Sequence, residues 1–179
     1  MNADQTPKIK TVPDHYTTVT PWLISPSSAL VIDFMQAAFG AQEVPNSRIT
    51  NNTGVVIHVV VRLGDAMLQL FDTRPGWGPT PSLLNLYVDD IEQAYQKALA
   101  LGATSVTAIT ELWFGEKVCR ILDPFGNLWW INQRIEDVDF TNPEIGKRAS
   151  TPEAIAGISY IQQSLDEAML AQKHFFATK

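Results

Sequence analysis

The chain has 179 residues, of which 45% are hydrophobic, enough to bury one core and typical of a single domain with tails. Its formal net charge of −6 argues against a general nucleic-acid binder, because binding to phosphates needs clustered Lys and Arg. No apolar run approaches the roughly 18 residues of a membrane span, and the first residues lack the layout of a signal peptide, so we expect a cytoplasmic protein that does not bind membranes.

The first half of the chain begins with a polar segment, residues 1–17, which predicts a flexible N-terminal arm. The patterns that follow predict a strand over 19–24, a helix over 27–39, and strands over 43–49, 55–63 and 66–71. Ser27 or Ser28 can cap the start of the helix and Gly40 its end. Gly64-Asp65 is a tight-turn signal between the last two strands. The order βαβββ defines a first module over about 18–72.

The second half repeats this order over about 82–135. A strand is predicted over 83–88, a helix over 90–101, and strands over 105–109, 117–122 and 128–132. Counting from Gly54 against Gly115 places His58 against Cys119 and Gln69 against Trp130. The Gly- and Pro-rich residues 73–81 form a linker. We therefore expect an α+β fold in which two βαβββ modules form a half-open barrel with a concave cleft.

The last segment, residues 136–179, is an extension with its own helix signal. Ser150-Thr151-Pro152-Glu153 combines a cap, a first-turn proline and a glutamate, and predicts a helix over about 151–172. Its apolar stripe consists of Ile155, Ile158, Ile161 or Gln162, Leu165 and Met169. We expect this stripe to dock on its own subunit or a dimer partner, or else on another protein.

Four segments follow one another along the two modules: Val19-Thr20-Pro21-Trp22-Leu23-Ile24, Phe39-Gly40-Ala41, Leu86-Tyr87-Val88-Asp89-Asp90 and Asp123-Pro124-Phe125-Gly126-Asn127-Leu128-Trp129-Trp130-Ile131. They resemble successive motifs of the vicinal-oxygen-chelate superfamily, which includes glyoxalases, bleomycin-resistance proteins and extradiol dioxygenases, and its PhnB-like branch in particular. The resemblance covers about residues 18–135. It implies a ligand cleft, frequent homodimers, and one of several functions: isomerisation, epimerisation, ring cleavage, thiol transfer to fosfomycin, or antibiotic sequestration without catalysis.

The resemblance also implies four positions at which metal-dependent members hold a divalent ion. Here they correspond to Thr20 or Pro21, Gln69, Leu83 and Trp130. Such an ion needs several converging lone-pair donors, and of these side chains only that of Gln69 is a plausible ligand. We therefore expect no metal cofactor, with a divalent metal in a rearranged ligand set as the alternative.

The predicted cleft carries amides and aromatic rings. Residues two apart on a strand face the same side, so Asn85 and Asn132 should lie in the cleft beside Leu83 and Trp130. The ligand-binding residues that we predict are Gln69, Asn85, Trp113, Trp130 and Asn132. This lining suits a planar or cationic organic molecule. The alternative is a core filled by large side chains, with no pocket.

His58 is the candidate catalytic residue, because its imidazole can serve as a general acid or base. Its other interpretation is a strand histidine bound to a neighbour. The leading hypothesis is a metal-independent small-molecule binding protein, as a homodimer. The alternatives are a lyase or isomerase that uses His58, a metal-dependent enzyme such as a dioxygenase with a rearranged site, and a partner-binding module that uses the C-terminal helix. Cys119, the single cysteine, is interpreted as a small buried hydrophobe.

Overall fold

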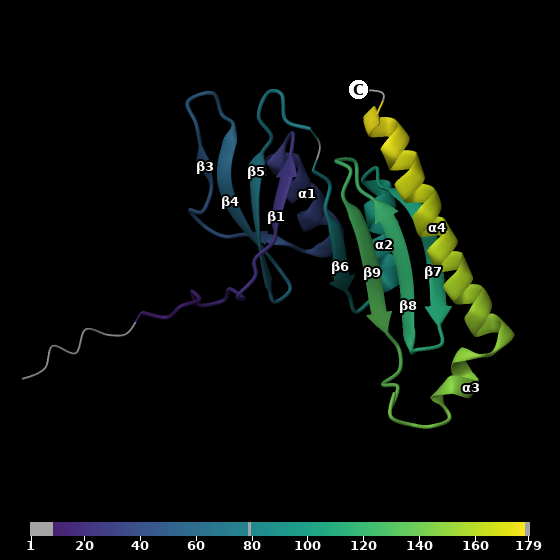
Figure 1. The fold of residues 1–179 in the computed structure, drawn as a ribbon. Helices are drawn as coiled ribbons and strands as arrows, with labels where there is room; N and C mark the ends of the chain where they lie inside the picture. Colours follow the sequence, from purple (N-terminus) through teal and green to yellow (C-terminus); the bar gives the residue numbers. More distant parts are fainter. Residues whose placement is uncertain (1–8, 79, 178–179) are drawn as a thin grey trace, which may run out of the picture.

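The computed structural model describes residues 9–78 and 80–177 and confirms the doubled βαβββ order (Figure 1). The first module contains β1 (Trp22–Ser25), α1 (Ser28–Phe39), β2 (Gln42–Glu43), β3 (Ile49–Thr50), β4 (Val56–Leu63) and β5 (Ala66–Asp72). The second contains β6 (Leu83–Tyr87), α2 (Ile91–Ala100), β7 (Thr104–Leu112), β8 (Glu116–Leu122) and β9 (Leu128–Arg134). Two further helices follow, α3 (Ile145–Ala149) and α4 (Pro152–Ala177). Residues 1–8 of the predicted N-terminal arm lie outside the described residues.

Each module builds one sheet. The first sheet has the order β1-β5-β4-β2, with β3 also paired to β4, and the second has the order β6-β9-β8-β7. In both sheets the first strand of the module runs parallel to the last, and the other pairs are antiparallel. The α+β class, the paired modules and the C-terminal helix are therefore as predicted. Within the described residues the two sheets are separate and do not close into one barrel.

The predicted strand over 43–49 is wrong. The structure has two strands of two residues in its place, β2 and β3, and the chain turns between them. Pro45 lacks a backbone N–H for a ladder, and Asn46 has a φ of 61°, in the left-handed region that strands do not use. The caps of α1 are as predicted, with Ser27 Oγ accepting from Leu30 N and Gly40 at a φ of 72°.

The helices α1 and α2 contact each other and cover the same side of the two sheets, behind them in Figure 1. One hydrophobic cluster therefore spans both modules. Its largest member is Trp129, 1% exposed, whose ring lies 4.9 Å from that of Phe39 of the other module. This shared core holds the two sheets side by side. No helix of the described residues is both long enough and apolar enough to cross a membrane.

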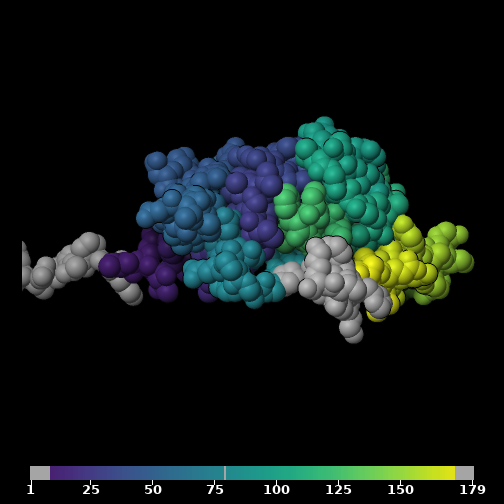
Figure 2. Space-filling model, turned by 90° about the horizontal axis from the view of Figure 1, so that it is seen from above, coloured from purple at the N-terminus to yellow at the C-terminus, as the bar shows by residue number. Residues whose placement is uncertain are grey.

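The helix α4 packs on β7 of its own chain, on the face of the second sheet opposite to α2. Figure 2 shows α4 in yellow along one side of the molecule, away from α2 in teal. Its buried side chains are Ala154, Ile161 and Ser164. Ile155 and Met169, which the predicted stripe included, are 55% and 51% exposed. The reason is close approach, because a Cβ at Gly157 would lie only 3.2 Å from Leu112 Cδ2, so the small-residue side of α4 faces the strand.

Cys119 lies in the shared core with no exposed surface, and burial raises the pKa of its thiol to about 12. Since the thiolate is the nucleophile, the folded protein should be unreactive toward a disulfide reagent at pH 8. We expect less than about a tenth of the thiol to react in an hour with native protein, and one equivalent within minutes in 8 M urea. Absorbance of the released thiolate measures both; a rapid full equivalent from native protein would contradict the buried position.

Candidate functional site

The helix-free face of the first sheet is the side opposite to α1. We call it the first face and define it by Trp22, His58, Val60, Gln69 and Phe71. Trp22 of β1 pairs with Gln69 of β5, and Gln69 pairs with Val60 of β4, so these three side chains form a row across the sheet. His58 lies two residues before Val60 on β4, and Phe71 lies two residues after Gln69 on β5. Both side chains are therefore on the same side of the sheet as the row.

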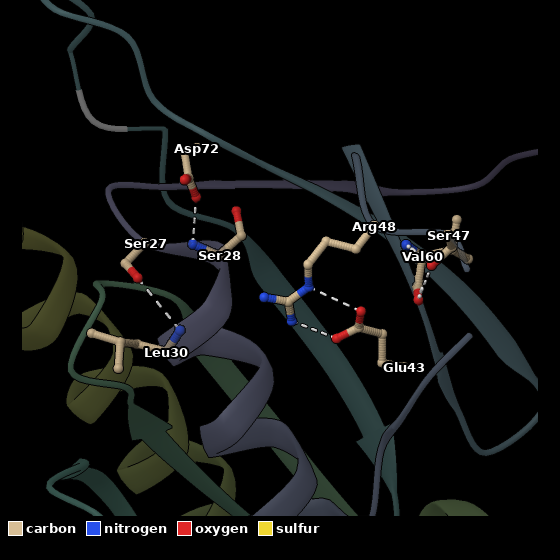
Figure 3. A network of polar contacts seen from close by, with 8 residues as sticks. All are labelled: Ser27, Ser28, Leu30, Glu43, Ser47, Arg48, Val60 and Asp72. Atoms are coloured by element: carbon tan, nitrogen blue, oxygen red, sulfur yellow. Dashed lines mark hydrogen bonds and ion pairs between the residues drawn. The ribbon is translucent and has the colours of Figure 1, made fainter. Parts of the chain in front are cut away.

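His58 is held at both ring nitrogens. Its Nδ1 lies 3.2 Å from the carbonyl oxygen of Ser47, and its Nε2 lies 3.1 Å from Oε1 of Gln69. Ser47 is fixed in turn, because its hydroxyl accepts from Val60 N at 3.0 Å and donates to Val60 O at 3.2 Å (Figure 3). Arg48, the next residue, makes a two-pronged ion pair with Glu43 that ties down the same loop.

Both contacts of His58 place an acceptor oxygen opposite a ring nitrogen. A neutral imidazole donates through only one nitrogen, so these two contacts can both be hydrogen bonds in two ways. Either His58 is an imidazolium that donates through both nitrogens, or the Gln69 amide is turned by 180° and its NH₂ donates to Nε2. In either arrangement the protein occupies both nitrogens. A general base needs one nitrogen within reach of the substrate proton, so the geometry favours His58 as the residue that orients Gln69.

Aromatic rings continue from this pair across the first face. Trp22 lies 5.6 Å from His58 and 5.4 Å from Phe71 between ring centroids, and Phe71 lies 5.9 Å from Trp77 of the linker. Trp22 and Trp77 are 43% and 49% exposed, so this is an accessible aromatic surface. The guanidinium of Arg74 lies 5.5 Å from the Trp77 ring centroid. The sequence prediction missed Trp22 as a site residue, although its place opposite Gln69 follows from the strand pairing.

The second sheet carries an equivalent row of side chains, on the side that α4 covers. Asn85 of β6, Trp130 of β9, Arg120 of β8 and Thr107 of β7 are paired in turn across the sheet. Asn132 lies two residues beyond Trp130 and donates from Nδ2 to Asn85 Oδ1 at 2.8 Å. Three predicted ligand-binding residues are therefore neighbours here. The face of the Trp130 ring is already covered, because the Arg120 guanidinium lies 3.8 Å from its centroid.

The two modules correspond as predicted at one position and not at another. Gln69 and Trp130 are equivalent, since each pairs with the first strand of its module. Their neighbours on the next strand are Val60 and Arg120, so His58 corresponds to Val118 and not to Cys119. The five residues 123–127 join β8 and β9, where two residues join β4 and β5, and the longer turn shifts the register.

The six predicted site residues do not meet in one cleft. His58 and Gln69 lie on the first sheet, and Asn85, Trp130 and Asn132 on the second. Trp113 lies apart, in the turn between β7 and β8, with its ring 5.6 Å from Phe114 and 6.2 Å from Phe140. The shared core holds the two sheets beside each other, and α4 covers the side of the second sheet that carries Trp130 (Figure 1).

The four positions at which the resemblance implies a metal ion offer few donors. Thr20 and Pro21 precede β1, and Leu83 pairs with Leu128. Across the described part of the chain, no group of three or more His, Cys, Asp or Glu side chains could hold an ion. His58 and Gln69 provide one imidazole and one amide, too few for a divalent metal, and they bind each other. These residues therefore do not fit a catalytic metal of the usual kind.

A cavity of about 530 Å³ lies between the modules, where the β4–β5 hairpin meets the ends of β6 and β9. None of the six predicted site residues lines it. Its two charged side chains, Asp89 and Arg134, are exposed, and Gln133 already accepts from Ile91 N. The cavity thus provides space with few converging polar groups, which makes it a weaker candidate than the first face.

The sequence and the fold of the chain are similar to those of known proteins. Residues 13–131 match the model of the Glyoxalase/Bleomycin resistance protein/Dioxygenase superfamily. An uncharacterized protein of Mycobacterium bovis is 31% identical over 132 residues, which cover 68% of this chain and 86% of that protein. The crystal structure of TioX from Micromonospora sp. ML1 has a TM-score of 0.54 at 17% identity, covering 66% of this chain and 99% of TioX. A PhnB protein from Bacillus cereus has a TM-score of 0.51 at 20% identity, covering 65% and 99%. The two structures are similar to this chain in fold.

Proposed function

The chain belongs to the glyoxalase/bleomycin resistance protein/dioxygenase superfamily, and we propose that it binds a planar organic molecule on the first face without a metal ion. The observation that carries this proposal is the accessible aromatic surface from His58 through Trp22 and Phe71 to Trp77, next to the oriented amide of Gln69. We also propose that the chain belongs to the PhnB-like branch, on the resemblance of the motifs at residues 86–90 and 123–131.

Stacking and one directed hydrogen bond supply the binding energy in this proposal. Trp22 and Trp77 offer exposed rings against which a flat molecule can lie. The side-chain amide of Gln69 has a carbonyl oxygen and an NH₂, and one of these two polar ends contacts His58; no other side-chain partner of Gln69 occurs among the described residues. The other end of the amide is therefore available to a ligand. Binding sites of this kind combine a mostly apolar lining with a few placed polar groups.

The charges near the first face favour a neutral or anionic ligand over the cationic one that the sequence left open. Arg74 already lies over the Trp77 ring, the position that a cationic ligand would take. Arg62, two residues from Val60 on β4, lies on the same side of the sheet. A ligand cation would meet these like charges.

Two of the three other functions considered for the sequence, a lyase or isomerase and a partner-binding module, have less support from the contacts of the described residues. A lyase or isomerase that uses His58 needs a free ring nitrogen, and both nitrogens contact the protein. A partner-binding role of the C-terminal helix would have to use its exposed apolar side chains Ile155, Met169 and Leu170, since the buried side of α4 contacts β7 of the same chain. We also propose that the protein is a homodimer, because the first face contacts only one side of a bound planar molecule and a second copy of the chain would contact the other side.

Purification without a chelator, followed by metal analysis and fluorescence titration, tests the proposal. We expect less than about 0.1 equivalent of zinc, nickel, manganese or iron, because the donor set is too small. The neutral probe 1-naphthol should quench tryptophan fluorescence saturably, with the same affinity in EDTA, and should bind more tightly than the cation N-methylquinolinium. Light scattering should give twice the chain mass. Stoichiometric metal, or a loss of naphthol binding in EDTA, would overturn the metal-free proposal.

A further inference from the structure

Arg120 is a buried cation without an acidic partner. It lies in the middle of β8 and is 2% exposed, and no ion pair of the described residues includes it. Its Nη1 donates to two neutral acceptors, the hydroxyl of Thr107 at 3.2 Å and the backbone carbonyl of Ile161 in α4. Burial lowers the pKa of Arg120, because the cation loses water and gains no carboxylate. A guanidinium is rarely buried in this way unless it meets an anion.

Two donors beside this cation have no acceptor. Nε of Arg120 and Nε1 of Trp130 are both buried and unpartnered among the described residues. They belong to neighbouring side chains, since the guanidinium lies over the Trp130 ring at 3.8 Å. Buried donors are nearly always satisfied, and a cationic donor forms its strongest hydrogen bonds with an oxyanion. The row from Thr107 to Trp130 therefore has the chemistry of an oxyanion site.

The helix α4 covers this row. The hydroxyls of Ser164 in α4 and Thr107 share a hydrogen bond of 2.6 Å, and the backbone carbonyl of Ile161 accepts from the guanidinium of Arg120. The contact that holds the helix is narrow: Ala154, Ile161 and Ser164 are its buried side chains, Tyr160 accepts from Ala108 N at 3.0 Å, and Ile155, Met169 and Leu170 are 55%, 51% and 60% exposed. A segment with such a narrow buried contact opens at a lower free energy than the core.

We propose that α4 is a displaceable cap over an oxyanion-binding pocket on the second sheet. The carboxylate or phosphate group of a small molecule replaces the Ile161 carbonyl at Arg120 and accepts from Arg120 Nε and Trp130 Nε1. The exposed end of the row, at Asn85, is the side from which a ligand enters. This pocket is separate from the first face, and its test does not depend on naphthol binding.

A pair of glycine substitutions in the full chain tests the cap. Gly157→Leu should push α4 away from β7, because even a Cβ at this position lies 3.2 Å from Leu112. Gly146→Leu is the matched control, since a Cβ at Gly146 in α3 meets nothing within 4 Å. By isothermal titration at constant ionic strength, G157L should bind inorganic phosphate or acetate at least 10-fold more tightly than the wild type and G146L. Equal affinities in all three proteins would overturn the proposal.

Adding Arg120→Met to G157L should abolish that gain, whereas retained affinity would place the anion elsewhere and overturn the proposal. Met keeps the length and apolar stem of the side chain, and replacing a buried ion by an apolar group is often tolerated. A measurement on the wild type does not depend on how either variant folds. Saturating phosphate should speed amide hydrogen exchange in residues 154–168 at least 3-fold and leave residues 91–100 of α2 unchanged. Unchanged or slower exchange in α4 with phosphate bound would contradict a cap.

Discussion

Replacing Asp123 with alanine should lower the free energy of unfolding by about 3–5 kcal/mol, because the substitution leaves several buried donors without an acceptor. Asp123 is 3% exposed, and its carboxylate accepts four hydrogen bonds, from the backbone N–H groups of Phe125 and Asn127, from Asn127 Nδ2 and from Trp129 Nε1. The last bond matters most for the fold, since Trp129 is the largest side chain in the shared core. One carboxylate thus fixes both the β8–β9 turn and the core tryptophan.

Urea denaturation followed by circular dichroism measures this loss. Asp139→Ala is the matched control, because Asp139 also accepts two hydrogen bonds in a turn, both from Thr141, but is exposed. We expect D139A to cost less than about 1 kcal/mol, as exposed substitutions do. If D123A and D139A lost the same stability, the carboxylate of Asp123 would not hold the core tryptophan as described.

Replacing Trp22 with alanine should weaken 1-naphthol binding at least 10-fold, which corresponds to about 1.4 kcal/mol. Trp22 contacts both His58 and Phe71, so its loss removes the centre of the aromatic surface and leaves the outer rings apart. The side chain is 43% exposed, so the folded state should tolerate the change. Affinity is measured by equilibrium dialysis, since the substitution itself removes one of the fluorescent side chains.

Trp113→Ala is the control for this substitution. Trp113 was predicted as a ligand residue, but it lies in the β7–β8 turn, where its ring contacts Phe114 and Phe140. Its loss should change naphthol affinity less than 2-fold. A result in which W113A loses binding and W22A retains it would move the site to the second module.

Much of the fold could be predicted because its signals are local. The capping side chain of Ser27, the left-handed Gly40 and the tight turn at Gly64 each act within a few residues, and the repeated order of elements follows from them. The C-terminal helix was also predicted from its start signal, and α4 begins at Pro152. The repeated order predicted two modules that form one fold, and the family resemblance implied the same pairing.

The features that could not be predicted depend on packing between distant segments. The side of α4 that is buried is set by the approach of Gly157 to Leu112, which a search for large apolar residues overlooks. From the sequence alone, Arg120 is indistinguishable from an exposed arginine on a strand. It is buried because α4, whose Ile161 lies about 40 residues later in the chain, covers it. The short helix α3 has no capping side chain, so it leaves no signal at all.

The predicted site residues fall into two groups in the structure, one on each sheet. Strand alternation placed Asn85 beside Asn132, and His58 was placed on a strand next to Gln69, both as observed. The convergence of all six residues required the two side-by-side sheets to curl around one cleft. The contact between α1 and α2 holds the sheets side by side, and α4 lies over the second sheet. The candidate site therefore moved to the first face, where Trp22 joins the predicted pair.

A nitrogen-15 NMR titration with 1-naphthol in EDTA tests metal-free binding on the first face at the level of single residues. The indole N–H signals of Trp22 and Trp77, and the amide signals of β1 and β5, should shift saturably with one dissociation constant. The indole signal of Trp129, in the core, and that of Trp113, in the distant turn, should stay in place. Saturable shifts confined to the second sheet, or no shifts until a divalent metal is added, would contradict the account.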